Sequence, residues 1–250
     1  MDATISTPVF AANHKWDRNF FLIWIGLVWA GIVVGFGSDI LGHIKSHAAP
    51  YPLIVHIHAL AFVGWLVLFT VQIWLIRSRK HEVHRNLGIG LICLAAVMIV
   101  LGPATAWIVE RQAFTKPGGG DASFLAVQFT DILAFGSLVV AGFLLRGTSS
   151  AHKRLMLLAT LYISDAGFAR FLAGPLAHLL GMSFAATLVE LYGAPDLLIL
   201  GLGAYDLITR KRLHRAYIAG VVWIFAIQLL AVYLLLSPAW KTVAAHLIGY

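Results

Sequence analysis

The sequence has few charged residues and almost no cysteine. Asp, Glu, Lys and Arg make up 12% of its 250 residues, hydrophobic residues make up 60%, and the mean hydropathy is +0.86. So little polar surface cannot coat a soluble globule, which excludes a water-soluble domain. The single cysteine, Cys93, has no partner within the chain, so a disulfide framework and a cysteine metal cluster are excluded as well.

Several motifs that carry a known chemistry are also absent. The sequence has no G-x-x-x-x-G-K-[ST] loop, no G-x-G-x-x-G turn and no H-E-x-x-H helix. The last apolar segment has no lysine, so a retinal Schiff base of the rhodopsin kind has no attachment point there. The net charge is +7, but the basic residues cluster at the ends of apolar runs, which indicates lipid headgroups rather than nucleic acid as partner.

Long apolar runs are what the sequence does have. A helix needs roughly 20 apolar residues to cross a hydrocarbon core. We predict seven spanning helices at 20–38, 52–76, 87–108, 123–145, 154–179, 185–208 and 216–236. The first run is too long for a signal-peptide core and lacks a small-residue cleavage site, so we expect it to stay as an anchor. The predicted fold class is therefore an all-α polytopic membrane protein, with one seven-helix domain over residues 1–250.

The basic residues predict an orientation. Of the 18 lysines and arginines, 13 flank the same side: Lys15, Arg18, Arg77, Arg79, Lys80, Arg85, Arg146, Lys153, Arg154, Arg210, Lys211, Arg212 and Arg215. The other side has only Lys45, Arg111, Lys116 and Lys241. The positive-inside rule then predicts a cytoplasmic N-terminus and an exterior C-terminus.

Three similar turns indicate an internal repeat. The turns RSRKHEVHRNLG, LLRGTSSAHKRLM and LITRKRLHRAYI each place a histidine beside basic residues at the start of the next helix. We therefore predict one helix followed by three hairpins. His84, His152 and His214 could form a ring of ligands or proton carriers, or they could anchor the topology by pairing with lipid phosphate.

Polar side chains inside the apolar runs are costly, so they indicate a site. At 1.5 Å per helical residue, the deepest of them lie about 20–28 Å from the basic turns, in the outer half of the bundle. Of the two histidines in Y-P-L-I-V-H-I-H, His58 shares a helix face with Trp65 and Gln72, at spacings of 7 and 14 residues. His56, two positions earlier, points to a different face.

These residues predict a metal site that opens outward. We expect His58, Asp131 and Asp196 to bind a divalent metal such as zinc, which would activate a bound water. Haem b, bound by His58 and His178, is a weaker alternative because the paired histidines of a four-helix cytochrome b are missing. The remaining polar residues have predicted roles around the metal: Asp165 as the catalytic proton carrier, and Arg170, Gln72 and Trp65 in substrate binding. Arg170 is expected to pair with Asp131, Asp196 or Glu190.

Three classes of function remain open. The preferred one is a metal-dependent membrane enzyme or redox protein that acts on a small molecule or a lipid. A transporter or proton pathway would use the intramembrane Asp and Arg groups as a relay. A non-catalytic subunit or receptor would need none of these groups to react. No oligomeric state is predicted.

The pattern His58…Trp65…Gln72…His84-Arg85-x-Leu87-Gly88, with A-H-K-R-L-M at 151–156, resembles uncharacterised bacterial multi-pass membrane proteins. That resemblance implies the inner membrane of a bacterium and no particular activity. The chain is also distantly similar to seven-helix membrane hydrolases of the adiponectin-receptor and alkaline-ceramidase kind, which hold zinc with histidines and an aspartate. It departs from them in having no H-x-x-x-H in its last span.

The C-terminal segment P-A-W-K-T-V-A-A-H-L-I-G-Y has a different pattern. Trp240, Val243, Leu247 and Tyr250 recur every three or four residues. We predict a short amphipathic helix over 238–250 that lies on the exterior membrane surface.

Overall fold

The structure, a computed structural model, describes residues 10–115 and 121–249, which form nine α-helices, one short 3-10 helix and no strand. Lys116 and Tyr250, which carried predictions above, lie outside these residues. The elements are α1 (Asp17–Lys45), α2 (Leu53–Arg77), α3 (His81–Phe114), η1 (Ala122–Phe124), α4 (Leu125–Leu144), α5 (Ser149–Tyr162), α6 (Asp165–Leu180), α7 (Phe184–Arg210), α8 (Arg215–Leu236) and α9 (Pro238–Leu247).

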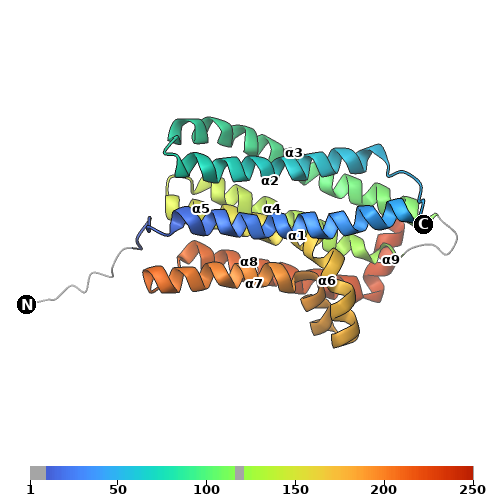
Figure 1. The fold of residues 1–250 in the computed structure, drawn as a ribbon. Coiled ribbons are helices and arrows are strands. Elements are labelled where there is room, and N and C mark those ends of the chain that lie inside the picture. Colours follow the sequence, from blue (N-terminus) through green and yellow to red (C-terminus); the bar gives the residue numbers. More distant parts are fainter. Residues whose placement is uncertain (1–9, 116–120, 250) are drawn as a thin grey trace, which may run out of the picture.

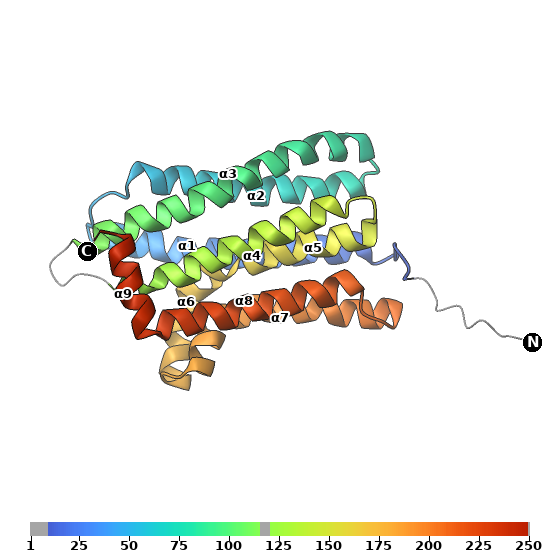
Figure 2. The same ribbon diagram turned by 180° about the vertical axis from the view of Figure 1, so that it is seen from behind.

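Most of the helices run side by side as one elongated bundle (Figures 1 and 2). In the described part of the chain, six segments are long and apolar enough to cross a membrane, namely α1, α2, α3, η1 with α4, α7 and α8. The α5–α6 pair, bent by 43°, makes a seventh span if it counts as one. The chain is therefore an all-α polytopic membrane protein, as predicted.

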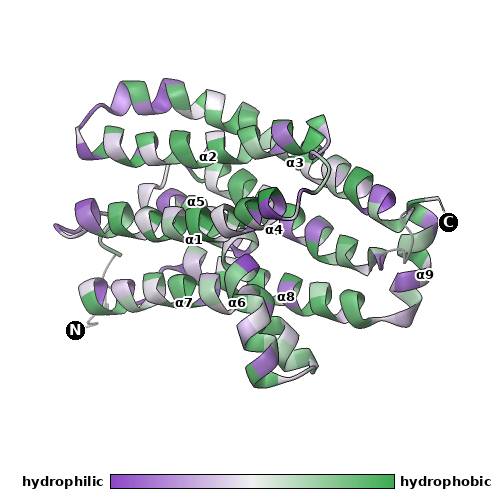
Figure 3. Cartoon of the chain, turned by 45° about the vertical axis from the view of Figure 1, so that its right-hand side comes forward, coloured by the Kyte–Doolittle hydropathy of each residue, from purple (hydrophilic) through white to green (hydrophobic). Residues whose placement is uncertain are grey.

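The outer surface of the bundle is apolar. Side chains such as Leu53, Leu60 and Val100 are more than 70% exposed along the helix shafts. Hydrophilic residues gather at the turns and helix ends, and the shafts are mostly hydrophobic (Figure 3). Apolar side chains on the outside of a helical bundle are stable in lipid, so this surface contacts the bilayer.

Helix α5 forms the centre of the bundle. All its residues from Arg154 to Tyr162 are buried, and it packs against α4, α7 and α8. A helix that is apolar all round buries every face, and the sequence RLMLLATLY has this composition in its interior. Trp65 of α2 reaches this helix, and its Nε1 donates to Oγ1 of Thr160 at 3.2 Å.

The span predicted at 154–179 consists of two helices in the structure, α5 and α6, bent by 43° at a short break. Helix α5 ends at Tyr162, Ser164 Oγ donates to the carbonyl oxygen of Leu161 at 2.5 Å, and α6 begins at Asp165. Beyond the break α6 packs against α1, and α6 with the start of α7 projects sideways, while the rest of α7 runs along the bundle (Figures 1 and 2). A Cβ atom on Gly35 of α1 would overlap the carbonyl oxygen of Gly167, so the two backbones touch here.

The two ends of the bundle differ in charge. One end carries the α2–α3, α4–α5 and α7–α8 turns, with Arg79, Lys80, Arg146 and Lys211, and we call it the basic end. Helix α9 lies across the opposite end, where η1 also lies (Figure 2).

Helix α9 is fixed to the opposite end by two tryptophans. Trp240 Nε1 donates to the carbonyl oxygen of Ser123 at 2.9 Å, and Trp107 Nε1 donates to that of Leu247 at 2.7 Å. Ala244 of α9 and Ile248, which follows it, are fully buried. The segment 238–247 is thus a helix that packs on the bundle, and its position at the membrane surface stays a prediction.

Candidate functional site

Four polar side chains meet beside the α5–α6 break, and we call them the carboxyl–tyrosine cluster: Asp131 of α4, Tyr162 of α5, Asp165 of α6 and Tyr192 of α7. The hydroxyl of Tyr162 donates to Oδ1 of Asp131 at 2.8 Å, and that of Tyr192 donates to the same oxygen at 3.1 Å. The two phenol rings stack with centroids 5.7 Å apart. The carboxyl groups of Asp131 and Asp165 lie within hydrogen-bonding reach of each other.

The helix break positions this cluster. Because α5 stops at Tyr162, the first turn of α6 starts inside the bundle, and Asp165 is its first residue. A carboxyl group in the first turn of a helix is favoured by the macrodipole and by free backbone N–H groups. Asp165 is only 6% exposed and Tyr192 is fully buried, so the cluster is shielded from solvent. It can accept or release a proton without a metal ion.

Arg170 lies one helical turn and a half beyond the cluster, on α6. Its Nε is 3.7 Å from Oδ2 of Asp39, and its guanidinium stacks over the ring of Phe36 at 3.9 Å. Both partners belong to α1. Arg170 therefore pairs with Asp39, and the prediction that it pairs with Asp131, Asp196 or Glu190 is wrong. The physical reason is the break, because it directs α6 along α1.

The predicted stripe on α2 does face inward. Trp65 is fully buried, and Gln72 is 5% exposed with no hydrogen-bond partner for either atom of its amide. His58 stacks on Phe62 with ring centroids 4.2 Å apart, and its Nδ1 is buried without a partner. His56 is exposed, and its Nδ1 lies 3.2 Å from the carbonyl oxygen of Pro52.

The three predicted metal ligands lie in separate contacts. His58 packs on Phe62, Asp131 accepts from the two tyrosines, and Asp196 Oδ1 accepts from Gln228 Nε2 at 2.8 Å. Within residues 10–115 and 121–249, no three His, Cys, Asp or Glu side chains are grouped so that they could hold a metal ion. The structure therefore brings together Asp131 and Asp165 and leaves His58 and Asp196 apart from them.

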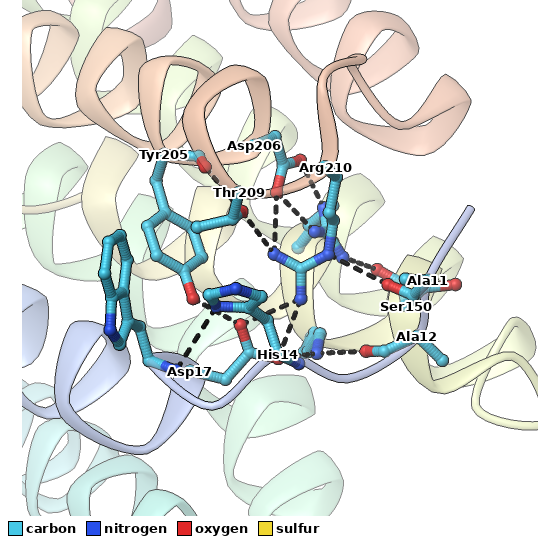
Figure 4. A network of polar contacts seen from close by, with 12 residues as sticks. Ala11, Ala12, His14, Asp17, Ser150, Tyr205, Asp206, Thr209 and Arg210 are labelled. Atoms are coloured by element: carbon cyan, nitrogen blue, oxygen red, sulfur yellow. Dashed lines mark hydrogen bonds and ion pairs between the residues drawn. The ribbon is translucent and has the colours of Figure 1, made fainter.

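A second polar cluster lies at the basic end (Figure 4). Asp17, at the start of α1, accepts from Arg210 Nη2 at 2.8 Å, from Lys153 Nζ at 2.7 Å and from the hydroxyl of Tyr205 at 2.6 Å. Arg210 Nε also donates to the carbonyl oxygen of Ala11 at 2.9 Å. These contacts join the first helix to α5 and α7.

Beneath them lies a fully buried ion pair between α5 and α7. Arg154 donates through Nε to Oδ2 of Asp206 at 2.6 Å and through Nη2 to Oδ1. The ring of Phe10 covers the guanidinium of Arg154 at 4.5 Å and that of Arg210 at 5.3 Å. Arg154 and Arg210, counted above among the basic residues that flank one side of the membrane, are therefore buried side chains. Asp206 lies four residues before Arg210 inside an apolar run, and this was the sequence feature that could have indicated a buried ion pair.

Comparison of the chain with protein-family models, with curated proteins and with solved structures finds no match. The fold by itself defines an integral membrane protein with several transmembrane helices.

Proposed function

We propose that the protein carries protons through the bilayer as part of a transport cycle, with Asp131 and Asp165 as the exchange site. The observation that supports this most directly is the pair of carboxyl groups in hydrogen-bonding reach inside the bundle. Ionisable groups inside a membrane domain are costly and mark ion or proton pathways.

The chemistry of the pair is that of a shared proton. Two ionised carboxylates in contact repel each other strongly where the dielectric constant is low, and one proton between them removes the repulsion. The hydroxyls of Tyr162 and Tyr192 both donate to Asp131, which stabilises negative charge on that residue. Asp165, at the helix break, then holds the proton that is exchanged.

The helix break supplies the element that can move. Broken helices in transporters bring helix ends to a buried site and allow one part of the bundle to shift against another. Here α6 carries Asp165 and also Arg170. Arg170 pairs with Asp39, and their side chains are 36% and 50% exposed, respectively. A shift of α6 along α1 would open or close the path between Asp165 and this half-exposed pair.

The basic turns support an orientation for this transport. Under the positive-inside rule the basic end faces the cytoplasm and α9 faces the exterior. The α5–α6 break and the Arg170–Asp39 pair would then lie on the exterior side of the pathway. We propose the bacterial inner membrane as the location on the strength of the resemblance in α2, α3 and α5.

Proton flux in proteoliposomes tests the proposal. Vesicles with an internal pH dye and an imposed potassium diffusion potential should acidify or alkalinise when they contain the wild-type protein. We expect Asp165→Asn and Asp131→Asn each to reduce the initial rate at least tenfold, because neither amide can exchange the proton.

Glu110→Gln serves as the matched control, since it changes a membrane carboxyl group on α3 outside the cluster. Its rate should stay within twofold of wild type. Melting temperatures of all variants show whether each is folded. Equal rates in wild type, in folded Asp165→Asn and in empty vesicles would rule out proton transfer through this pair.

A further inference from the structure

Two histidines from different hairpins meet at the basic end, away from the carboxyl–tyrosine cluster. His84 lies in the first turn of α3 and His152 in the first turn of α5. Their ring centroids are 6.3 Å apart, with the ring planes at 87°. Two imidazoles bound through ring nitrogens about 2.0 Å from one metal ion, on opposite sides of it, also have centroids roughly 6 Å apart.

The hydrogen bond of His152 sets which nitrogen is free. Its Nδ1 is 2.8 Å from the carbonyl oxygen of Gly142 on α4. A carbonyl oxygen only accepts, so Nδ1 carries the proton and Nε2 keeps its lone pair. Metal-binding histidines commonly donate their other N–H to a backbone carbonyl in this way, because it fixes the tautomer and the ring orientation.

Three buried polar atoms in and beside the pair have no hydrogen-bond partner. They are Nδ1 of His84 and both amide atoms of Gln72. Gln72 adjoins His84 from the α2 side, since its Nε2 would lie 3.5 Å from a Cβ on Gly88, one turn after His84. A buried polar atom without a partner costs about 1–3 kcal/mol, so three together indicate a bound group.

We infer that His84 and His152 hold a first-row transition-metal ion between them; where that ion is a free ion, the carboxamide oxygen of Gln72 is a further donor. Neutral imidazoles suit copper, zinc, nickel and iron, and an ion at this point would engage the unpartnered donors. Because the third donor is an amide, the site needs no third His, Cys, Asp or Glu.

The ion has two chemical sources, a free ion or the iron of a porphyrin. Arg85 follows His84 and is exposed. Its cation repels a bare dication and attracts the carboxylates that a porphyrin carries. The experiment therefore has two arms. The site uses none of the residues of the proposed proton pathway, so the failure of one proposal leaves the other unaffected.

The first arm examines the full-length protein as purified in detergent, by absorption spectroscopy and by total metal analysis. A Soret band with one iron per chain would identify porphyrin iron as the source. That band should be lost in His84→Ala and in His152→Ala and kept in His246→Ala, which changes an exposed histidine at the opposite end of the bundle.

The second arm applies if no Soret band is present. The metal-free protein is titrated with Zn²⁺ and with Cu²⁺ against a competing chelator. We expect one equivalent bound per chain, with affinity at least 100-fold weaker in each of the two histidine variants, 10- to 100-fold weaker in Gln72→Leu, and unchanged in His246→Ala.

Paramagnetic resonance of Cu²⁺-loaded wild type keeps the test independent of variant folding. Hyperfine coupling to two imidazole nitrogens is the expected result. Absence of a Soret band together with equal metal affinity in wild type and in the His84→Ala/His152→Ala double variant would overturn the inference. Cu²⁺ spectra without nitrogen coupling would overturn it as well.

Discussion

Arginine side chains of this chain lie in opposite environments, and Arg154, which pairs with Asp206, is a buried one. Arg154 lies in the run H-K-R beside a turn, and from the sequence alone it is indistinguishable from the exposed cations around it. Only the packing of α5 against α7 places it opposite Asp206, where both side chains are almost completely buried. A charge buried to this degree is stable only while its partner remains.

Asp206→Asn should therefore destabilise the protein strongly. The variant leaves the guanidinium of Arg154 buried without a counter-charge, which costs about 3–5 kcal/mol. Thermal or denaturant unfolding in detergent measures the change.

The double variant Arg154→Met/Asp206→Leu is the control, because it removes both charges at similar volume. We expect it to recover most of the lost stability. A loss below about 1 kcal/mol in Asp206→Asn would contradict the buried, uncompensated charge.

His214 at the α7–α8 turn gives the molecule a dependence on pH. Its Nδ1 accepts from the backbone N–H of Ala216 at 3.0 Å, which caps α8, and its Nε2 lies 3.1 Å from Oγ of Ser150. Burial, and then the charge of Arg154, lower the pKa of His214 below its usual value. The imidazole is therefore neutral in the folded protein at pH 7, as the cap requires.

Acidification should then destabilise wild type through His214. The pKa is lower in the folded than in the unfolded state, so the stabilising contribution is complete above pH about 6.5 and is lost as the pH falls through the folded pKa. His214→Asn keeps an acceptor at the cap and removes the titration. Melting temperatures at pH 7.5 and 5.5 should differ more in wild type than in the variant, and equal differences would count against this role.

At the scale of an element, the α5–α6 break is the feature that the sequence hides. The segment Y-I-S-D contains neither proline nor glycine, so hydropathy predicts one helix over 154–179. The bend accompanies tertiary packing, because α6 lies against α1 at Gly31, Gly35 and Gly167. The G-x-x-x-G spacing of Gly31 and Gly35 was a signal for close helix packing in a membrane.

Gly35→Ala should disturb this packing. The added Cβ would overlap the backbone of Gly167, so α1 and α6 must separate, at a cost of about 1–3 kcal/mol. Gly37→Ala is the matched control, since a Cβ there meets nothing within 4 Å. We expect it to be neutral or slightly stabilising. Unfolding measurements that rank the two variants equally would exclude a close α1–α6 contact.

At the scale of the whole molecule, composition and hydropathy predict the architecture well. The spans predicted at 52–76, 123–145 and 216–236 differ by one residue at most at each end from the corresponding structural segments. Asp131 and Asp165 were recognisable because a carboxylate inside an apolar run is costly. Tyr162 and Tyr192 were not, because tyrosine is also common at lipid interfaces and nothing local shows that two rings from distant helices stack.

The orientation of the bundle can be tested by labelling. In a Cys93→Ala background, Lys80→Cys lies at the basic end and Thr242→Cys on α9, and both positions are exposed. A membrane-impermeant thiol reagent applied to intact cells should label Thr242→Cys and spare Lys80→Cys. Labelling of Lys80→Cys alone would invert the orientation, and labelling of both would contradict a bundle that crosses the membrane.

The contacts of Asp17 also impose an order on biosynthesis. This residue is made 193 positions before Arg210 and 136 before Lys153, the two cations that neutralise it. During translation the first helix must therefore wait in the membrane, with its carboxylate in the headgroup region, until the sixth span, α7, has been inserted. The bundle is complete only when translation has nearly finished. A chain that stops before α7 therefore lacks the Asp17–Arg210 ion pair that fixes its first helix, and quality-control proteases should degrade it.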